Sequence, residues 1–255
     1  AAGVWAAAVR GHESFDTSRR NHILYETPSL HGFTLQAAVA EDNYWDVALR
    51  YAGEFGGFRV AFGIGYQKDS EFNAGAQIGA GTAGVLCANT CDVESEEWKG
   101  SLSILHVQSG LFVTTAYAVR ELSGFAAPGI AYVGPDITNW WIAGGIRQNW
   151  TGFGATVIWG EYGVFKGGLA QTAFLAATAA PCGAGTAVSH DCVSNSEVTT
   201  WGVGILQNFD AAAMELFLTY KNFSLDATGF LGANAALNNN VADFSTVIIG
   251  ARIFF

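Results

Sequence analysis

The sequence predicts an all-β protein, a transmembrane antiparallel β-barrel, and three observations lead to this class. Apolar residues alternate with polar or small residues at period two along most of the chain, as in strands with two unlike faces. The 32 Gly, 18 Phe, 8 Trp and 8 Tyr against 4 Pro favour strands and tight turns, because aromatic residues suit a pleated sheet and glycine suits turns. Short connections alternate with mostly long ones, as in barrels of the outer membrane.

Individual strands are identified by their alternation. The clearest example runs from Trp45 to Ala52, where large apolar side chains share one face and small or charged side chains share the other. A shift of one residue would invert every side chain, so the pattern assigns the faces. The eleven expected strands are 20–27, 32–40, 45–53, 57–68, 96–107, 111–120, 138–149, 153–161, 198–209, 212–223 and 243–255.

The connections differ in length according to their order along the chain. Short turns are expected at 28–31, 54–56, 108–110, 150–152 and 210–211, and they alternate with links at 41–44, 69–95, 121–137, 162–197 and 224–242. The short turns are assigned to the periplasmic end and the long links to the extracellular end. Because such barrels have an even number of strands, either 2–10 is a twelfth strand or strands are missing from the front of this sequence.

Charged residues avoid one face of the expected strands. A charge facing lipid at mid-membrane costs about 2–4 kcal/mol, so the face without charges is assigned to the lipid. The charges on the other face are Arg50, Arg59, Lys99, Arg120, Arg147, Glu215, Lys221 and Arg252. Two interpretations apply to the acidic residues, a binding site for divalent cations that bridge lipopolysaccharide or neighbouring subunits, or solvated loop charges, and we expect the second. These residues are Asp42, Asp46, Glu94, Glu96 and Glu97.

Aromatic residues gather near the ends of the strands. Two interpretations remain open at this point, an interfacial girdle of a membrane barrel or ordinary core aromatics of a soluble barrel. The residues concerned are Trp45, Trp98, Trp140, Trp141, Trp150, Trp201 and Phe255.

Composition also excludes several classes of protein. No apolar stretch approaches the roughly 18 residues of a membrane helix, and a net charge of −10 argues against nucleic acid as a partner. Catalysis is not expected, because His12, Ser14 and Asp16 crowd into one short segment, whereas catalytic triads draw on separate elements. We expect no cofactor.

The cysteines form two close pairs, Cys87 with Cys91 and Cys182 with Cys192. Two local loop disulfides are the simplest interpretation, and they imply an oxidising compartment. A structural metal site would need more ligands, and only His190 lies near either pair, so we expect no metal.

A resemblance to a known family adds to these observations. The run FDTSRRNHILYETPSLHGFTLQAAVAEDNYWDVALRYAGEFGGFRVAFGIGYQ, from Phe15 to Gln67, resembles strands six to nine of general porins of the alphaproteobacterial kind. The ending Ile253-Phe254-Phe255 resembles their assembly signal, with Phe255 as the last residue. The resemblance implies a barrel of about 16 strands, a homotrimer and a place in the outer membrane, among lipid and lipopolysaccharide. On this map strands one to five are absent.

The same resemblance implies a function and a site. Residues 1–19 correspond to the end of an inner loop that narrows the pore, and residues 20–255 to the barrel strands. The expected function is passive diffusion of ions and small hydrophilic solutes. Glu13 and Asp16 would lie on the loop, facing basic residues of the loop base and wall. These basic candidates are Arg10, Arg19, Arg20, Arg50 and Arg59.

Three alternatives to a general diffusion channel remain. A substrate-selective channel or a surface adhesin would be favoured by aromatic tracks inside the lumen or by unusually large loop domains. A soluble β-barrel binder would need polar outer faces, which the alternation does not show.

Overall fold

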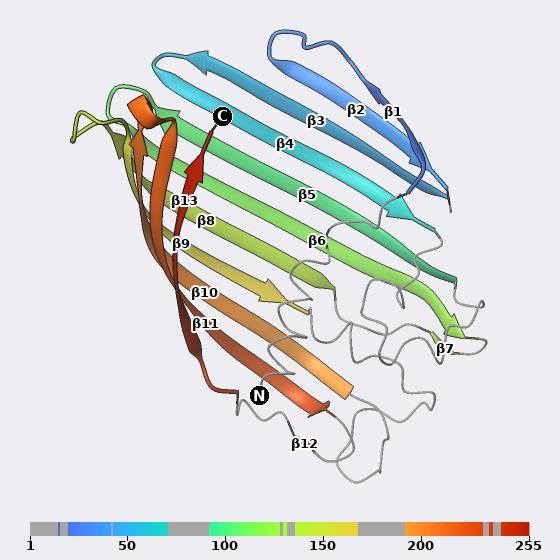
Figure 1. Ribbon diagram of the computed structural model, residues 1–255. Coiled ribbons are helices and arrows are strands. Elements are labelled where there is room, and N and C mark those ends of the chain that lie inside the picture. The colour runs from blue at the N-terminus through green and yellow to red at the C-terminus, as the bar shows by residue number, and fades with distance from the viewer. Residues whose placement is uncertain are drawn as a thin grey trace.

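The computed structural model describes residues 15, 20–41, 43–70, 92–127, 130–131, 136–167, 192–231, 235–236 and 241–254. Most of these residues form one strongly curved antiparallel sheet (Figure 1). Its strands are β1 (His22–Glu26), β2 (Phe33–Ala40), β3 (Tyr44–Phe55), β4 (Phe58–Asp69), β5 (Asp92–His106), β6 (Leu111–Ala127), β7 (Ile130–Ala131), β8 (Ile137–Gln148), β9 (Thr156–Lys166), β10 (Cys192–Phe209), β11 (Met214–Leu231), β12 (Ala235–Ala236) and β13 (Phe244–Ile253).

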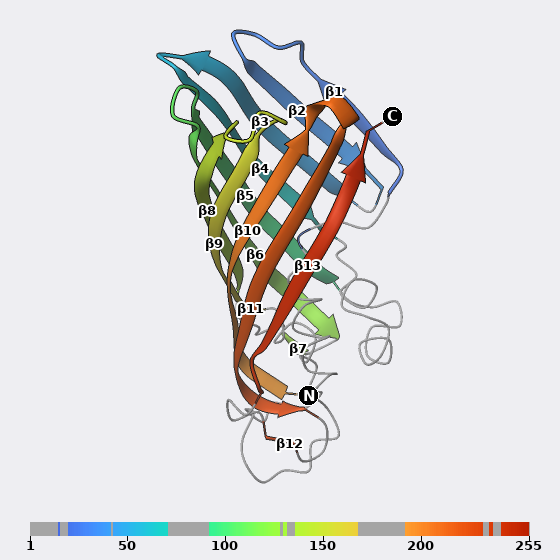
Figure 2. The ribbon, with the colours of Figure 1, turned by 60° about the vertical axis from the view of Figure 1, so that its left-hand side comes forward.

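Strands that follow one another in the chain are neighbours in the sheet. The order runs from β1 through β6 to β8, β9, β10 and β11, and β13 pairs with β11. The two short strands β7 and β12 pair with β6 and β11, respectively. Figure 2 shows β1 and β13 as the two margins of the curled sheet. All eleven expected strands are therefore present, and the all-β antiparallel architecture is confirmed.

Several strands continue further into the long links than expected. Segments 92–95, 121–127, 162–166, 192–197 and 224–231 were expected in links, but they are strand. Their polar residues interrupt the apolar alternation, yet the backbone ladders continue past the apolar band, as in the pairing of Ser95 with Leu122. The expected strand 212–223 begins two residues later, at Met214, because residues 210–212 form a 3-10 turn before β11.

Short turns gather at one end of the sheet, together with the end of β13, at the top of Figure 1. The tightest turn joins β3 to β4 through Gly56 and Gly57, whose φ angles are 57° and 80°. Two consecutive positive φ values define a hairpin turn whose twist matches that of the strands, and glycine adopts them without strain. The link between β2 and β3, residues 41–43, is the short exception among the connections at the opposite end.

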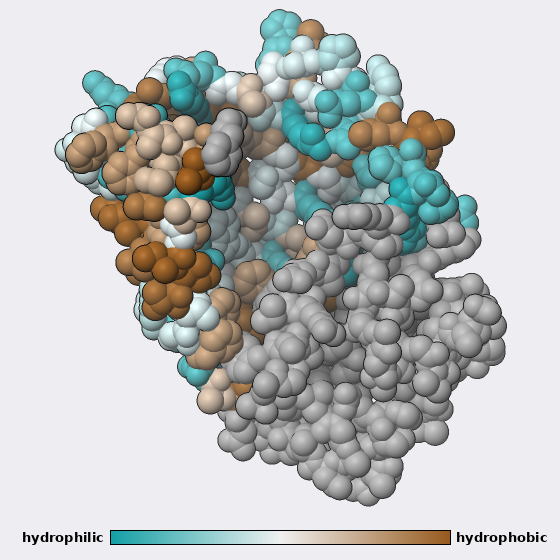
Figure 3. Space-filling model, viewed as in Figure 1, coloured by the Kyte–Doolittle hydropathy of each residue, from teal (hydrophilic) through white to brown (hydrophobic). Residues whose placement is uncertain are grey.

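Strand register places large apolar side chains on the outer face all around the sheet. Leu49 lies opposite Ile64, Ile158 opposite Ile205 and Leu218 opposite Ile249. Many of these side chains are exposed, including Ile249 at 81%. Figure 3 shows hydrophobic atoms along the left margin and hydrophilic atoms within the hollow. This apolar exterior excludes the soluble barrel.

An aromatic belt runs across the outer face from β3 to β11, toward the long links. Its ring centroids approach to 5.2 Å for Trp45 and Tyr66, 4.7 Å for Tyr66 and Trp98, and 5.4 Å for Trp201 and Tyr220. These rings are on the exterior, as an interfacial girdle requires. Within the described strands, charged residues of the outer face lie only beyond this belt. They include Lys68, Glu94, Glu96, Glu121, Lys166, Glu197 and Asp226.

Trp141 was grouped with these belt residues, and that expectation is wrong. Trp140 pairs with Tyr117 on the outer face, so the next residue, Trp141, lies on the inner face opposite Ala116 and Gly163. The physical reason is the period of two along a strand, which sends adjacent side chains to opposite faces.

Candidate functional site: the inner wall and its buried charge network

A buried charge network lies on the inner face of β5 and β6. Glu97 and Arg120 are direct cross-strand partners, and their side chains are 0% and 1% exposed. Arg120 Nε donates a hydrogen bond to Glu97 Oε1, and Lys99 Nζ lies 2.8 Å from Glu97 Oε2. Because a buried carboxylate needs close compensation, the two cations account for the burial of Glu97. The interpretation of Glu97 as a solvated loop charge is wrong.

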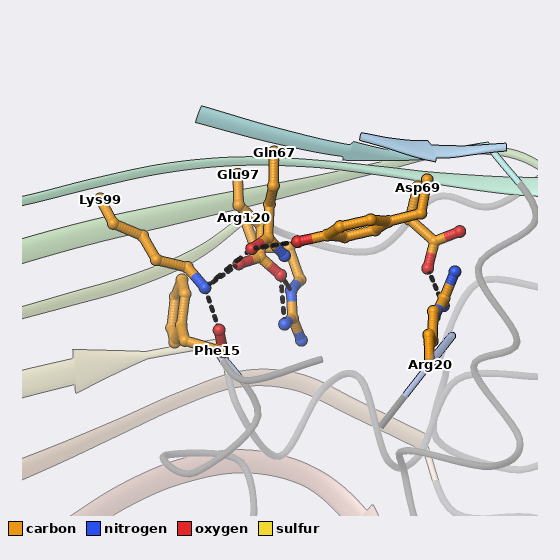
Figure 4. A network of polar contacts seen from close by, with 8 residues as sticks. Phe15, Arg20, Gln67, Asp69, Glu97, Lys99 and Arg120 are labelled. Carbon is orange, nitrogen blue, oxygen red and sulfur yellow. Dashed lines mark hydrogen bonds and ion pairs between the residues drawn. The ribbon is translucent and has the colours of Figure 1, made fainter. Parts of the chain in front are cut away.

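The network contacts Phe15, a residue of the segment before β1 (Figure 4). Lys99 Nζ donates a hydrogen bond to the carbonyl oxygen of Phe15, and the guanidinium carbon of Arg120 lies 5.2 Å from the centre of the Phe15 ring. Lys99 also donates to Gln67 Oε1 at 3.1 Å. Phe15 is therefore attached to the inner wall by a backbone hydrogen bond and a cation–π contact.

Arg20 makes a second attachment just before β1. Its guanidinium forms an ion pair with Asp69 at the end of β4, and the two side chains are 10% and 1% exposed. The same guanidinium lies 5.2 Å from the centre of the Tyr44 ring. Arg20 is thus engaged at the edge of the wall, near the long links.

Arg50 and Arg59 also lie on the inner face, as expected, and both have partners there. Arg50 donates to Gln36 and lies 3.5 Å from Glu26, with side chains that are 57% and 50% exposed. Arg59 donates to Glu54 at 2.7 Å, beside the β3–β4 turn. Arg59 is therefore at the short-turn end of the wall, far along β4 from the Glu97 network.

Paired charges recur around the rest of the inner wall. Lys221 Nζ lies 2.5 Å from Glu161, and Arg252 lies 3.1 Å from Glu215. Strand alternation places both pairs on the inner face. In the ladders, Lys221 lies opposite Gly202 and Glu215 lies opposite Arg252. A wall of this kind presents cations and anions side by side toward the hollow, while its outer face remains apolar.

Most other predicted site residues lie outside the described part of the chain. They are Arg10, Glu13, Asp16, Arg19, Cys87, Cys91, Cys182 and Phe255. Cys192 begins β10, and nothing further is described of its side chain. The opposition of Glu13 and Asp16 to basic residues, and the two disulfides, therefore remain predictions.

Sequence patterns did not identify Asp69, Gln67, Tyr44 and Phe15 as parts of this site. Strand parity was the available signal. The expected strand 57–68 already placed Gln67 on the inner face with Arg59, and its extension by one residue would have placed Asp69 there too. No pattern in the sequence points to the attachment of Phe15, because it joins positions 84 residues apart.

The described residues offer neither a metal centre nor a membrane helix. None of them combine into a group of three or more His, Cys, Asp and Glu side chains suited to a metal ion. Among the same residues, no helix has the length and apolar character needed to cross a membrane.

Comparison with solved structures finds OmpT of Vibrio cholerae, described as an outer membrane protein. Its in-vitro folded trimer form has a TM-score of 0.49 and 16% identity, covering 92% of this chain and 64% of that chain. Another OmpT structure has a TM-score of 0.47 and 15% identity, covering 92% of this chain and 64% of that chain. A mutant of OmpT that lacks loop L8 has a TM-score of 0.46 and 15% identity, covering 90% of this chain and 61% of that chain. The chain spans less than two thirds of the length of each of these structures.

No curated protein matches the sequence. A sequence profile described as Gram-negative porin matches residues 1–229. This match covers most of the chain, and the curled antiparallel sheet has the apolar exterior and charged interior of an outer-membrane barrel wall. The chain therefore belongs to the Gram-negative porin family, whose members are proteins of the outer membrane.

Proposed function

We propose that this chain forms the wall of a passive, water-filled channel for ions and small hydrophilic solutes, and that it is not an enzyme. The observation that carries the proposal is the division of charge between the two faces of the sheet. Inward charges such as Arg50 and Lys221 line the hollow, whereas outward charges occur only beyond the aromatic belt in the described strands. Charged side chains on the inner face attract water and ions into the lumen, which the low-dielectric wall surrounds.

The narrowest part of the channel would be formed by the segment before β1. Residues 1–19 would act as an inner loop, with Glu13 and Asp16 facing basic residues of the wall. The attachments of Phe15 to Lys99 and Arg120 support a loop held against the inner wall. The acidic loop would favour cations through a transverse field. The family resemblance further suggests a homotrimer in contact with lipopolysaccharide, with disulfides bridging two of its loops.

Single-channel recording in planar bilayers tests this function. The folded protein should show stepwise openings in groups of three, and a salt gradient should give a reversal potential that reports weak cation preference. Neutralising the loop with Glu13→Gln and Asp16→Asn should shift that potential toward anions.

Glu121→Gln is the matched control, because this carboxylate is exposed on the outer face beyond the belt and should leave the potential unchanged. A folded protein that never conducts would refute the channel. Conduction with no response to the loop substitutions would refute the assigned role of Glu13 and Asp16.

A further inference from the structure

A trough in the inner wall combines features that a simple water-filled channel does not require. It has a volume of about 480 Å³, within the roughly 300–1,000 Å³ typical of small-molecule sites. Its floor consists of small residues on four neighbouring strands, β3 to β6. These are Ala48, Gly63, Gly65, Ser101, Ala116 and Ala118.

One rim of the trough is aromatic. Trp141 projects from β8 and Phe165 from β9, and both side chains are partly exposed. Gly163 lies directly opposite Trp141 in the ladder, and the ring of Phe165 lies 3.0 Å from the place where a Gly163 Cβ would stand. The absence of a side chain at Gly163 therefore leaves room for the Phe165 ring beside Trp141.

Cationic and polar side chains complete the trough. Lys99 and Asn139 occupy the same row of the sheet, separated by Ala118, so their backbones are about 10 Å apart. Arg50 lies on the far side of the floor, with its side chain 57% exposed. Lys99 and Arg50 pair with Glu97 and Glu26. Among the described residues that line the trough itself, however, there are these two cations and no carboxylate, and this lining favours an anion.

We propose that this trough is a solute subsite that favours small, flat organic anions, namely an aromatic ring bearing a carboxylate. The ring would pack against Trp141 and Phe165 in the offset-stacked or edge-to-face arrangement that aromatic pairs prefer. The carboxylate would be oriented by Lys99 or Arg50. The inference rests on the proposed channel function and refines it toward the substrate-selective alternative.

Bi-ionic reversal potentials at pH 8 test the subsite, with benzoate compared against cyclohexanecarboxylate. The two anions match in charge and approximate size, but only benzoate is flat and aromatic. We expect benzoate to be the more permeant anion and to cause longer interruptions of the potassium chloride current.

Two tryptophans on opposite faces of the sheet supply matched variants. Trp141→Ala should shorten the benzoate interruptions about fivefold or more, the loss expected for one stacking contact. Trp98→Ala removes the same side chain from the outer face, where Trp98 lies opposite Tyr66 and outside the lining of the trough, and should leave the interruptions unchanged. Arg50→Gln should weaken the binding of benzoate and of cyclohexanecarboxylate to the same extent, because it removes a charge and leaves the stacking contact in place.

The outcomes separate the subsite from the channel itself. Potassium chloride current with no discrimination between the two anions overturns the subsite and leaves the channel intact. Stronger interruption by glucose than by benzoate also overturns it, in favour of a neutral sugar site. Equal effects of Trp98→Ala and Trp141→Ala on the benzoate interruptions would exclude stacking in the lumen. Absence of any current would refute the channel function instead.

Discussion

Glu97→Gln tests the buried charge network most directly. Glu97 is 0% exposed and lies between Arg120, which is 1% exposed, and Lys99, which is 35% exposed. Removing one member of a buried ion pair costs about 3–5 kcal/mol, because the remaining charge loses its compensation. Loss of the ion pair with the half-solvated Lys99 adds at most about 1 kcal/mol to this cost. The glutamine oxygen still accepts one hydrogen bond, so we expect a loss near the lower limit, about 3 kcal/mol.

The measurement is denaturant unfolding of the barrel in phospholipid vesicles, with Glu96→Gln as the control. Glu96 is 40% exposed on the outer face and pairs with Lys68 at 2.9 Å, so its neutralisation should cost no more than about 1 kcal/mol. In single-channel records, Glu97→Gln should also increase current fluctuations, because Lys99 and Arg120 attach Phe15 to the wall. Equal unfolding free energies for the two variants, together with equally quiet currents, would refute the reasoning.

Three further predictions concern the two faces and one turn. Leu102→Arg places a charge on the outer apolar band and should destabilise the barrel in vesicles by about 2–4 kcal/mol, whereas Ser103→Arg, one residue further on the inner face, should be much milder; equal losses would contradict the assigned faces. Gly204→Ala should cost about 1–3 kcal/mol in the same unfolding assay, because the Trp159 ring occupies the space of the added Cβ; wild-type stability would contradict that packing. Gly57→Ala should cost about 1–2 kcal/mol through its φ of 80° alone, because nothing lies within 4 Å of the added atom; an unchanged unfolding free energy would show that the turn relaxes.

Strand alternation was sufficient to predict the architecture. In β3, the segment from Trp45 to Ala52 keeps a strict period of two, and its observed register with β2 and β4 agrees with the predicted faces. The ends of strands were less predictable, since Glu94, Glu96 and Glu121 lie on the outer face beyond the apolar band. Polar residues there resemble a loop in the sequence, while backbone pairing continues the strand.

The site was less predictable than the fold, because it depends on contacts between distant segments. The inward orientation of Arg50 and Arg59 followed from parity, but their partners Glu26 and Glu54 depend on register and rotamer. Trp140 and Trp141 are a different case. Both are tryptophans near a strand end, and the register of β8 shows that Trp141 faces the lumen, the face that alternation with Arg147 also assigns to it.

This wall has almost no hydrophobic core. Among the described residues, the buried apolar side chains are few, and they are Ala38, Tyr44, Ile137, Ala143, Val164, Val198, Leu225 and Ala227. The sheet is one layer thick, so cohesion comes from the ladders between strands and from the surrounding lipid. An exposed side chain that faces the hollow, such as Arg50, can therefore change without the repacking of a second layer. Substitutions at inward-facing positions can then change which solutes pass, while the outward-facing positions continue to determine insertion into the membrane.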